Sequence, residues 1–400
     1  MANLFNMRDT STWSDPDYRP LNYRELAFKL WPTSPTPLTY LLSKLPSRSV
    51  DDPEYNIFEW RLPQQSWVVA SVSTDDPGAR SHVIQVPAGE AYGLKVGDLL
   101  EKESTAQQYK VTVASTDGAG FTAIEWAANT THPAASDVLR WVGSVYLEGS
   151  GAPESVMRTP SLVTNFTQIF KDSVEITGTA DATRTRPFKP WAQAKAECLE
   201  RHMLKLEYAT MRGQKKEETG GANPARTFGG LNEWITEEKD FESGGMSMDD
   251  LEDQLQIAFK YGSKDKALIC GNTAIKIMNR VARNHAALQF NMTDKMNKDQ
   301  TFGLAVTEWV TPFGVLRIVP HALMSESDAY TQDGYILDFK YLEYIKLRGR
   351  DTKWYPNAQD NDQDSKRGYY QTECGFSVAL PEVHQQWLNI SAFGADTPPV

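Results

Sequence analysis

Apolar and polar residues alternate over short distances between Trp67 and Leu147, which predicts β-strands rather than helices. Glycine, proline, aspartate and asparagine interrupt this alternation about every ten to fifteen residues. The predicted strands are Trp67–Val72, His82–Val86, Val96–Glu101, Tyr109–Ala114, Phe121–Trp126 and Val138–Leu147. Short strands at this spacing indicate a small antiparallel barrel or sandwich.

A helical spacing of apolar residues replaces this alternation between Lys189 and Lys216 and predicts the longest helix of the chain. Pro190 stands where a first-turn proline is tolerated, and Gly213 marks the end. The expected apolar stripe consists of Ala192, Ala196, Leu199, Met203, Leu206 and Thr210. His202 falls within this pattern, where a histidine is more often packed or hydrogen-bonded than a metal ligand.

The chain after Gly221 alternates between helical and strand patterns, which predicts an α/β arrangement. Ser247 and Asp250 form a capping box before one amphipathic helix, and residues 274–288 predict a second. The predicted strands are Ala267–Cys270, Val315–Val319, Tyr335–Asp338, Tyr341–Leu347 and Phe376–Leu380. Two loops, Asn291–Thr301 and Pro356–Gly368, interrupt this pattern.

Prolines are dense in residues 1–55, and aromatic residues lie between them. Such a composition favours extended chain, with one short helix expected at Leu21–Leu30. A free tail would be poor in aromatic residues, so we expect this arm to lie on a protein surface. That surface is either the core of the same chain or a neighbouring molecule, and the sequence favours neither.

The composition excludes several classes of protein. The chain has 400 residues, 40% of them hydrophobic, and a formal net charge of −11, which argues against a protein that clamps nucleic acid through its phosphates. We expect neither a transmembrane segment nor a secretory signal, since no apolar run is long enough and the first residues lack a basic region. Cys198, Cys270 and Cys374 are far apart and odd in number, which favours buried thiols in a reducing compartment. The expectation is a soluble protein made in a cytoplasm.

A search for chemistry finds no catalytic, cofactor-binding or metal-binding motif. The histidines never pair at helical spacing, no Cys-x-x-Cys exists, and Gly149-Ser150-Gly151 lacks the rest of a dinucleotide fingerprint. The segment Asp360–Asp364 resembles a calcium loop, but Ser365 and Gln371 stand where an EF-hand needs glycine and glutamate. We therefore expect a solvated acidic loop there, with a weak structural cation as the alternative. Local motifs give no sign of a cofactor or of enzyme activity, although widely separated residues could still assemble a site in space.

Several short phrases follow one another in a characteristic order. They are Val96-Gly97-Asp98, Thr167-Gln168-Ile169-Phe170, Val174-Glu175-Ile176-Thr177-Gly178-Thr179-Ala180, Phe228-Gly229-Gly230-Leu231, Thr311-Pro312-Phe313-Gly314 running to Pro320, Gly334-Tyr335-Ile336-Leu337-Asp338 and Glu373-Cys374-Gly375-Phe376. Their order and wording resemble the major capsid proteins of tailed bacteriophages, in particular a branch long catalogued as a domain of unknown function. The proline-rich start of the long helix and the N-terminal arm depart from that pattern.

The resemblance implies an α+β fold, the tailed-phage major capsid fold (HK97-like, or Johnson fold). Residues 1–55 would be the N-terminal arm, and residues 56–187 an extended loop arm carrying the inserted β module at about 64–150. Residues 188–224 would contain the spine helix of the peripheral domain, 225–335 mainly the axial domain, and 336–400 the return strands of the peripheral domain with the C-terminal tail.

The resemblance also implies a function. Copies would self-assemble as hexamers and pentamers into an icosahedral virion shell in the bacterial host cytoplasm, enclosing double-stranded DNA without sequence-specific binding. A separate scaffolding protein, a portal and a decoration or cement protein are the further partners it implies, with no membrane. The candidate inter-subunit anchors are Trp13, Trp31, Tyr40, Trp60 and Trp67, with packing inside their own chain as the alternative. Two rival functions are a tail or head-completion ring protein and a carbohydrate-acting enzyme.

Overall fold

Two compact units make up the chain in the computed structural model. The model describes residues 38, 47–61, 64–76, 80–115, 118–127, 132–152, 155, 159–183, 189–221, 223–242, 244–286 and 308–394. One unit, the barrel unit, is Phe58–Leu162, and the other, the body, combines the chain up to Ile57 with the chain from Val163 onward. The helix expected at Leu21–Leu30 and the loop expected at Asn291–Thr301 lie outside the described residues.

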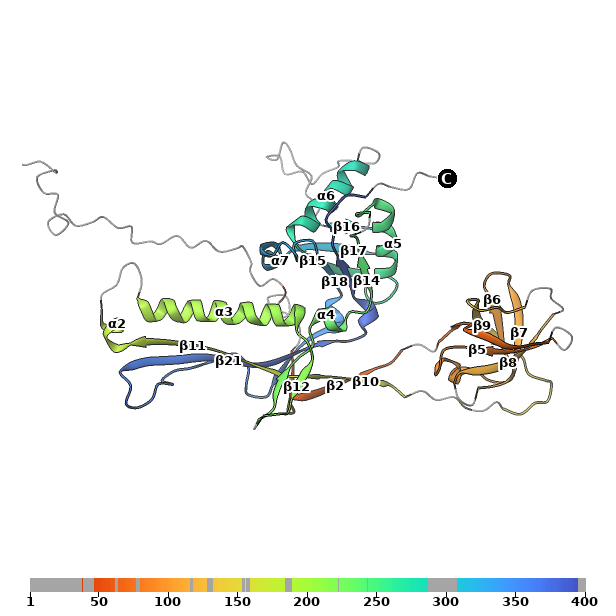
Figure 1. Ribbon diagram of the computed structural model, residues 1–400, viewed down its shortest axis with the longest axis horizontal. Coiled ribbons are helices and arrows are strands. Elements are labelled where there is room, and N and C mark those ends of the chain that lie inside the picture. Colours follow the sequence, from red (N-terminus) through yellow and green to blue (C-terminus); the bar gives the residue numbers. More distant parts are fainter. Residues whose placement is uncertain are drawn as a thin grey trace, which may run out of the picture. The chain divides into compact units, whose positions relative to one another are not determined.

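The barrel unit contains a seven-stranded sheet in which every neighbouring pair of strands is antiparallel. Its strands are β3 (Ser66–Val68), β4 (Ser71–Asp76), β5 (Ser81–Gln85), β6 (Asp98–Lys102), β7 (Gln107–Val113), β8 (Gly120–Glu125) and β9 (Val138–Ser144), with the 3-10 helix η1 (Glu90–Gly93) between β5 and β6. Five of the six strands predicted between Trp67 and Leu147 are therefore confirmed, as β5 to β9 (Figure 1).

One predicted strand, Trp67–Val72, is two strands in the structure. The sheet runs in the order β3-β9-β6-β7-β8-β5-β4, so these two consecutive strands form its opposite edges. Between them, the Val69 amide donates to Asp137 on one side and the Ala70 amide donates to Gln85 on the other. The chain can change edges within two residues only if the sheet curls round, so the unit is a barrel.

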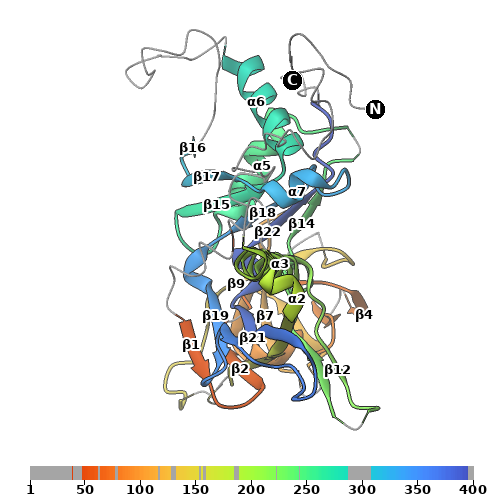
Figure 2. The same ribbon diagram turned by 90° about the vertical axis from the view of Figure 1, so that its left-hand side faces the viewer.

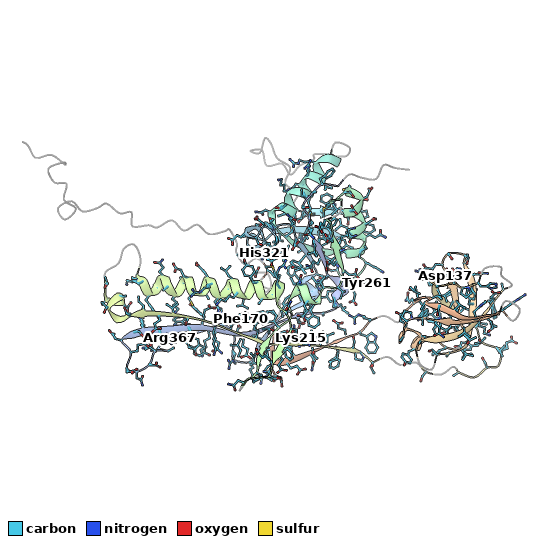
Figure 3. The ribbon with its side chains drawn as sticks, viewed as in Figure 1. Asp137, Phe170, Lys215, Tyr261, His321 and Arg367 are labelled. Carbon is cyan, nitrogen blue, oxygen red and sulfur yellow. The ribbon has the colours of Figure 1, made fainter. Side chains whose placement is uncertain are left out.

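The body is organised around a long antiparallel pair, β11 (Gln168–Thr177) and β21 (Ser365–Val378). β19 (Leu342–Leu347) and β20 (Lys353–Tyr355) also pair with β21, and β1 (Ser47–Val50) adds in parallel to β19. Helix α3 (Pro190–Arg212) lies along β11 and β21, as Figures 1 and 2 show from two directions. Phe170 of β11, labelled in Figure 3, packs in the core that α3 covers.

A six-stranded sheet forms the other half of the body, in the order β14-β22-β18-β15-β17-β16. These strands are β14 (Glu238–Asp240), β15 (Asp265–Cys270), β16 (Glu308–Val310), β17 (Val315–Pro320), β18 (Gly334–Leu337) and β22 (Gln385–Leu388). Helices α5 (Met248–Ala258) and α6 (Asn272–Ala286) contribute Leu251, Leu255 and Met278 to the apolar core beside this sheet. The remaining body elements are α2 (Gly178–Ala182), β12 (Lys216–Glu218), β13 (Ala225–Thr227), α4 (Leu231–Trp234), α7 (Ala322–Glu326), η2 (Phe339–Tyr341) and η3 (Pro381–Val383).

Local sequence signals predicted the positions of helices α3 and α5 correctly. The long helix was predicted over Lys189–Lys216 and spans Pro190–Arg212, with proline in its first turn. The Ser247 hydroxyl accepts from the Asp250 amide at 3.0 Å, which is the predicted cap of α5. No helix among the described residues is long and apolar enough to cross a membrane.

The prediction was wrong for β21, which starts at Ser365 rather than Phe376, and it missed β11 and β22. Gln371, Thr372 and Glu373 in β21 are polar and nevertheless buried, as are Gln385 and Gln386 in β22. Polar residues at buried strand positions remove the apolar alternation on which a strand prediction depends. Buried polar residues therefore obscure β21 and β22, whereas β11 does alternate, with Phe170 and Val174 on its buried face.

Candidate functional site

A two-stranded ribbon presents apolar side chains to solvent. It consists of β2 (Glu54–Glu59) and β10 (Ser161–Phe166), which within the described residues pair with each other alone. Phe58 in β2 is 72% exposed and Leu162 in β10 54%, and Trp60, which directly follows β2, is 66% exposed. Buried Tyr55 and Asn165 anchor the ribbon by donating to the Phe376 carbonyl. Exposed aromatic and aliphatic side chains gathered on one element indicate a contact surface.

The outer surface of the barrel unit also exposes aromatic residues. Trp126, Trp141 and Tyr146 are each more than two-fifths exposed, together with Val142 and Leu147. The Trp141 indole donates to the Gly143 carbonyl at 2.9 Å, and the Lys110 ammonium lies 5.4 Å from the Trp126 ring centre. These contacts hold the rings in place while leaving their faces accessible.

Helix α3 buries polar residues against the β11–β21 pair. His202 is fully buried, with Nδ1 2.9 Å from Asp172 Oδ2 and Nε2 2.8 Å from Thr372 Oγ1. Lys205 also contacts the Asp172 carboxylate. Burial by itself raises the pKa of Asp172, but hydrogen bonds from Lys205 and His202 outweigh it and hold the pKa below its usual value. The prediction that His202 is packed and hydrogen-bonded is thus confirmed.

A second buried carboxylate, Glu207, lies on the same helix. It accepts hydrogen bonds from the Leu38 amide at 2.9 Å and from His321 Nε2 at 2.8 Å, and both Glu207 and His321 are fully buried. His321 is labelled in Figure 3. Leu38 itself is buried in the body core, so at this residue the N-terminal segment packs on its own chain. This is one of the two arrangements that the sequence left open for the arm.

The buried face of α3 differs from the predicted stripe. Ala192 and Ala196 are exposed, whereas the buried residues are Cys198, His202, Leu206, Glu207, Thr210 and Met211. The predicted stripe is confirmed at Leu206 and Thr210 and wrong at Ala192 and Ala196, and the buried face also carries the ionisable side chains of His202 and Glu207. Here Asp172 and His321 on other elements satisfy them, so the helix can turn that face inward.

Polar side chains gather at one end of the barrel interior. His82 Nε2 lies 3.1 Å and His132 Nδ1 2.8 Å from Glu125 Oε1. Nearby, the Lys102 ammonium lies 2.7 Å from Asp137 Oδ2, and Asp137 is labelled in Figure 3. Burial, with the negative charges of Glu125 and Asp137, raises the pKa of Tyr109 to about 12. The interior of the barrel is therefore apolar along most of its length and ionic at this end.

The structure divides the candidate anchors. Trp60 is exposed on the ribbon, whereas Trp67 is 3% exposed in the barrel core, where its indole donates to the Glu90 carbonyl at 2.9 Å. Trp67 thus packs within its own chain, the alternative that the sequence left open. Trp13, Trp31 and Tyr40 lie outside the described residues.

The cysteines are structural, as predicted. Cys198, Cys270 and Cys374 are free thiols and buried. Burial raises the pKa of Cys270 and of Cys374 to about 12, so neither is a thiolate at neutral pH. All residues of the acidic segment Asp360–Asp364 are exposed, as expected for a solvated loop.

The sequence search missed the group formed by His82, Glu125 and His132. Its members are 43 and 7 residues apart along the chain, so no local motif joins them. One signal was available in retrospect. His82 and Glu125 both occupy inward positions of alternating strands, where an apolar residue is expected.

Comparison with known proteins shows the family of the chain. A family model described as SU10 major capsid protein matches residues 10–389. A major capsid protein of Pseudomonas phage PaMx41 is 22% identical over 298 residues, covering 71% of this chain and 69% of that protein. Among solved structures, the capsid of cyanophage A-1(L) superposes with a TM-score of 0.50 at 9% identity, covering 95% of this chain and 99% of that one. The capsid of a native GTA particle covers 97% of this chain and 100% of that chain, with a TM-score of 0.46 at 8% identity.

The mixed α+β fold is that of phage capsid proteins (HK97-like), as the sequence resemblance predicted. Within that class, the chain belongs to the SU10 major capsid protein family. It is a structural protein of the phage head, and the predicted function of major capsid protein is confirmed.

Proposed function

We propose that copies of this chain assemble as hexamers and pentamers into a closed icosahedral shell around double-stranded DNA, without catalysis. The β2–β10 ribbon carries this proposal. Phe58, Trp60 and Leu162 stay exposed in the single chain, and burying them against a neighbouring copy would remove apolar area from water. The cost of leaving them exposed in a monomer is the driving force for assembly.

The body supplies the rigid frame in this proposal. Helix α3 with β11 and β21 is the spine of the peripheral domain, and the six-stranded sheet with α5 and α6 is the main part of the axial domain. The barrel unit is the module inserted in the extended loop arm. Its exposed Trp126 and Trp141 are the side chains on which we expect a decoration protein or a neighbouring copy to pack.

The charge of the chain suits enclosure of DNA. A net charge of −11 disfavours tight binding to phosphates, so the packaged genome would remain free to leave the shell. We further propose that assembly takes place in the bacterial cytoplasm, on a separate scaffolding protein and from a portal. The buried free thiols are compatible with that reducing compartment.

The test is to express the full chain, alone and with the neighbouring genes of its phage, and to image the products by electron microscopy. We expect closed shells or free hexamers. Monomers alone would contradict the proposal, and rings of one fixed copy number would instead favour a tail or head-completion protein.

The role of the ribbon is tested by Trp60→Ala, with Trp60→Phe as the matched control that keeps an aromatic ring. We expect the alanine variant to stay folded by circular dichroism but to give a markedly lower shell yield, and the phenylalanine variant to recover most of it. A normal shell yield from Trp60→Ala would show that the ribbon does not drive assembly.

A further inference from the structure

Three side chains with metal-binding atoms meet at the polar end of the barrel. One ligand atom from each of His82, Glu125 and His132 lies within 4.8 Å of the other two. The side chains of His82 and Glu125 are 0% and 1% exposed, whereas that of His132 is 30% exposed. The group is thus closed on the barrel side and open to water on one side.

The barrel sheet itself brings two of these residues together. β5 and β8 are antiparallel neighbours in which His82 pairs with Ala123, and Glu125 lies two residues further along the same inward face. Side chains two positions apart share a face of a strand, so the pairing places imidazole and carboxylate side by side. The ring of Tyr109 meets the His82 ring edge-on at 6.2 Å between centres.

The third residue, His132, comes from the segment that precedes β9 and is held by a lysine. The Lys102 ammonium donates to the His132 carbonyl at 3.3 Å and pairs with Asp137 at 2.7 Å. The His82 and His132 ring centres are 5.1 Å apart. Groups outside the ligand set that fix the backbone and orientation of a ligand are typical of metal sites.

The spacing of the three atoms suits a small divalent ion. Zinc binds imidazole nitrogen and carboxylate oxygen at about 2.0–2.2 Å in a tetrahedron, which separates ligand atoms by about 3.3 Å. The Glu125 oxygen is already 3.1 Å and 2.8 Å from the two nitrogens. The side chain of His132 is partly exposed and can move to reach the ligand distance. A water molecule can reach the fourth coordination position of the ion from the same side.

The charge distribution favours a cation at this point. Lys102 is paired with Asp137, and the buried carboxylate of Glu125 contacts the two imidazoles of His82 and His132. An ionised carboxylate is costly to bury without a balancing positive charge. A divalent ion would balance it and would join β5, β8 and the segment before β9 in one linkage.

We propose that His82, Glu125 and His132 bind a divalent transition-metal ion of the zinc type, with water as the fourth ligand, and that this ion stabilises the barrel. The two nitrogens and one oxygen exclude calcium and magnesium as the preferred ions, because those ions favour oxygen ligands. The role is structural and independent of shell assembly. Three ligands and an accessible fourth position predict moderate affinity and loss of the ion to chelators.

The experiment uses the full-length chain after treatment with EDTA and dialysis. Calorimetric titration with zinc should show one equivalent bound, and titration with cobalt should produce the visible absorption bands of a tetrahedral site. His132→Ala should weaken zinc binding by at least about tenfold, the loss that even an outer-sphere substitution causes. His285→Ala, in α6 of the body, is the matched control and should bind zinc as the unaltered chain does.

A structural readout complements the binding measurement. Zinc should raise the unfolding temperature of the unaltered chain and of His285→Ala, but not that of His132→Ala. Glu125→Gln should lose the tetrahedral cobalt bands. If Glu125→Gln does not fold, His132→Ala still tests the site, because its side chain is partly exposed and lies outside the strands.

Three results would overturn the proposal. They are no zinc binding by the unaltered chain, binding that persists in His132→Ala and Glu125→Gln, and a zinc-bound chain with the same unfolding temperature as the EDTA-treated one. Each would mean that the three residues form a hydrogen-bonded cluster in which both imidazoles donate to the carboxylate without any metal.

Discussion

The barrel unit and the body are both built on β-sheets, but their strands are joined over very different distances along the chain. All the strand pairs of the barrel lie within residues 66–144 and are antiparallel, and three of the six pairs join consecutive strands. In the body, β1 pairs in parallel with β19, and β14 with β22, each across more than 100 residues. The barrel can therefore form from local contacts, whereas the body needs both ends of the chain.

The two units also differ in how they bury charge. The body distributes buried carboxylates along α3 and the strands beneath it, where Asp172 and Glu207 each contact a histidine. The barrel gathers His82, Glu125 and Lys102 at one end, and Asp98 is buried at the other end of β6. Substitutions in one unit should therefore leave the other unchanged, and the following four predictions test that separation.

The largest effect is expected from Trp67→Ala. This indole is 3% exposed in the barrel core, and its loss should lower the free energy of unfolding of the barrel by about 3–5 kcal/mol. Denaturant unfolding followed by near-ultraviolet circular dichroism measures it. Trp60→Ala, on an exposed tryptophan seven residues earlier, is the control and should change stability by less than about 0.5 kcal/mol. Equal losses for the two variants would contradict the assigned core.

Glu207→Ala should destabilise the body by about 3 kcal/mol. The substitution leaves His321 Nε2 and the Leu38 amide without their acceptor in a fully buried place. Glu207→Gln is the matched control. It keeps an acceptor oxygen, so it should lower the free energy of unfolding by less than Glu207→Ala does. Hydrogen exchange can show that only the body is destabilised, because the amides of β6–β9 in the barrel should exchange as slowly as in the unaltered chain. Equal loss of protection in the barrel would mean that the units do not unfold separately.

His384 should make the stability of the body depend on pH. Burial, together with the positive charge of Lys266, lowers its pKa from the usual 6.5 to about 4. The unfolded chain therefore binds a proton between pH 6.5 and 4 that the folded chain does not, so stability is full above pH 6.5 and falls as the pH drops towards 4. The shift corresponds to a loss of up to about 3 kcal/mol.

The variant His384→Asn should flatten this slope. Asparagine can still accept a hydrogen bond from the Asp338 amide, which now donates to His384 Nδ1 at 3.2 Å. Unfolding measured in denaturant at several pH values between 4 and 7 gives the slope. A variant that loses stability over this range as steeply as the unaltered chain would show that another group is responsible.

Asp172→Asn should have the smallest effect, a loss of about 1–2 kcal/mol at neutral pH. The pKa of Asp172 is held below its usual value in the folded chain, so its contribution is present above about pH 4 and disappears as the pH falls through the lowered pKa. The difference between the variant and the unaltered chain should therefore shrink below pH 4. A difference that stays constant with pH would mean that the Asp172 carboxylate is not stabilised by Lys205 and His202.

Some of the fold could be predicted because its signals are local. The alternation on β5 through β9 is visible in any short window, as are the proline at the start of α3 and the cap at Ser247. Such patterns depend on the backbone geometry of a few adjacent residues. The resemblance to phage capsid proteins likewise came from short phrases in a fixed order, and it identified the family.

The sequence by itself therefore determined the strands of the barrel, the long helix, the buried thiols and the class of protein. Only the tertiary structure decided which buried ionisable residues meet: Glu207 with His321 under α3, and His82 with Glu125 and His132 in the barrel. The physical reason is that burying a polar group depends on a partner, and the partners here stand on other elements far along the chain. A sequence pattern within one segment therefore gives no information about these distant partners.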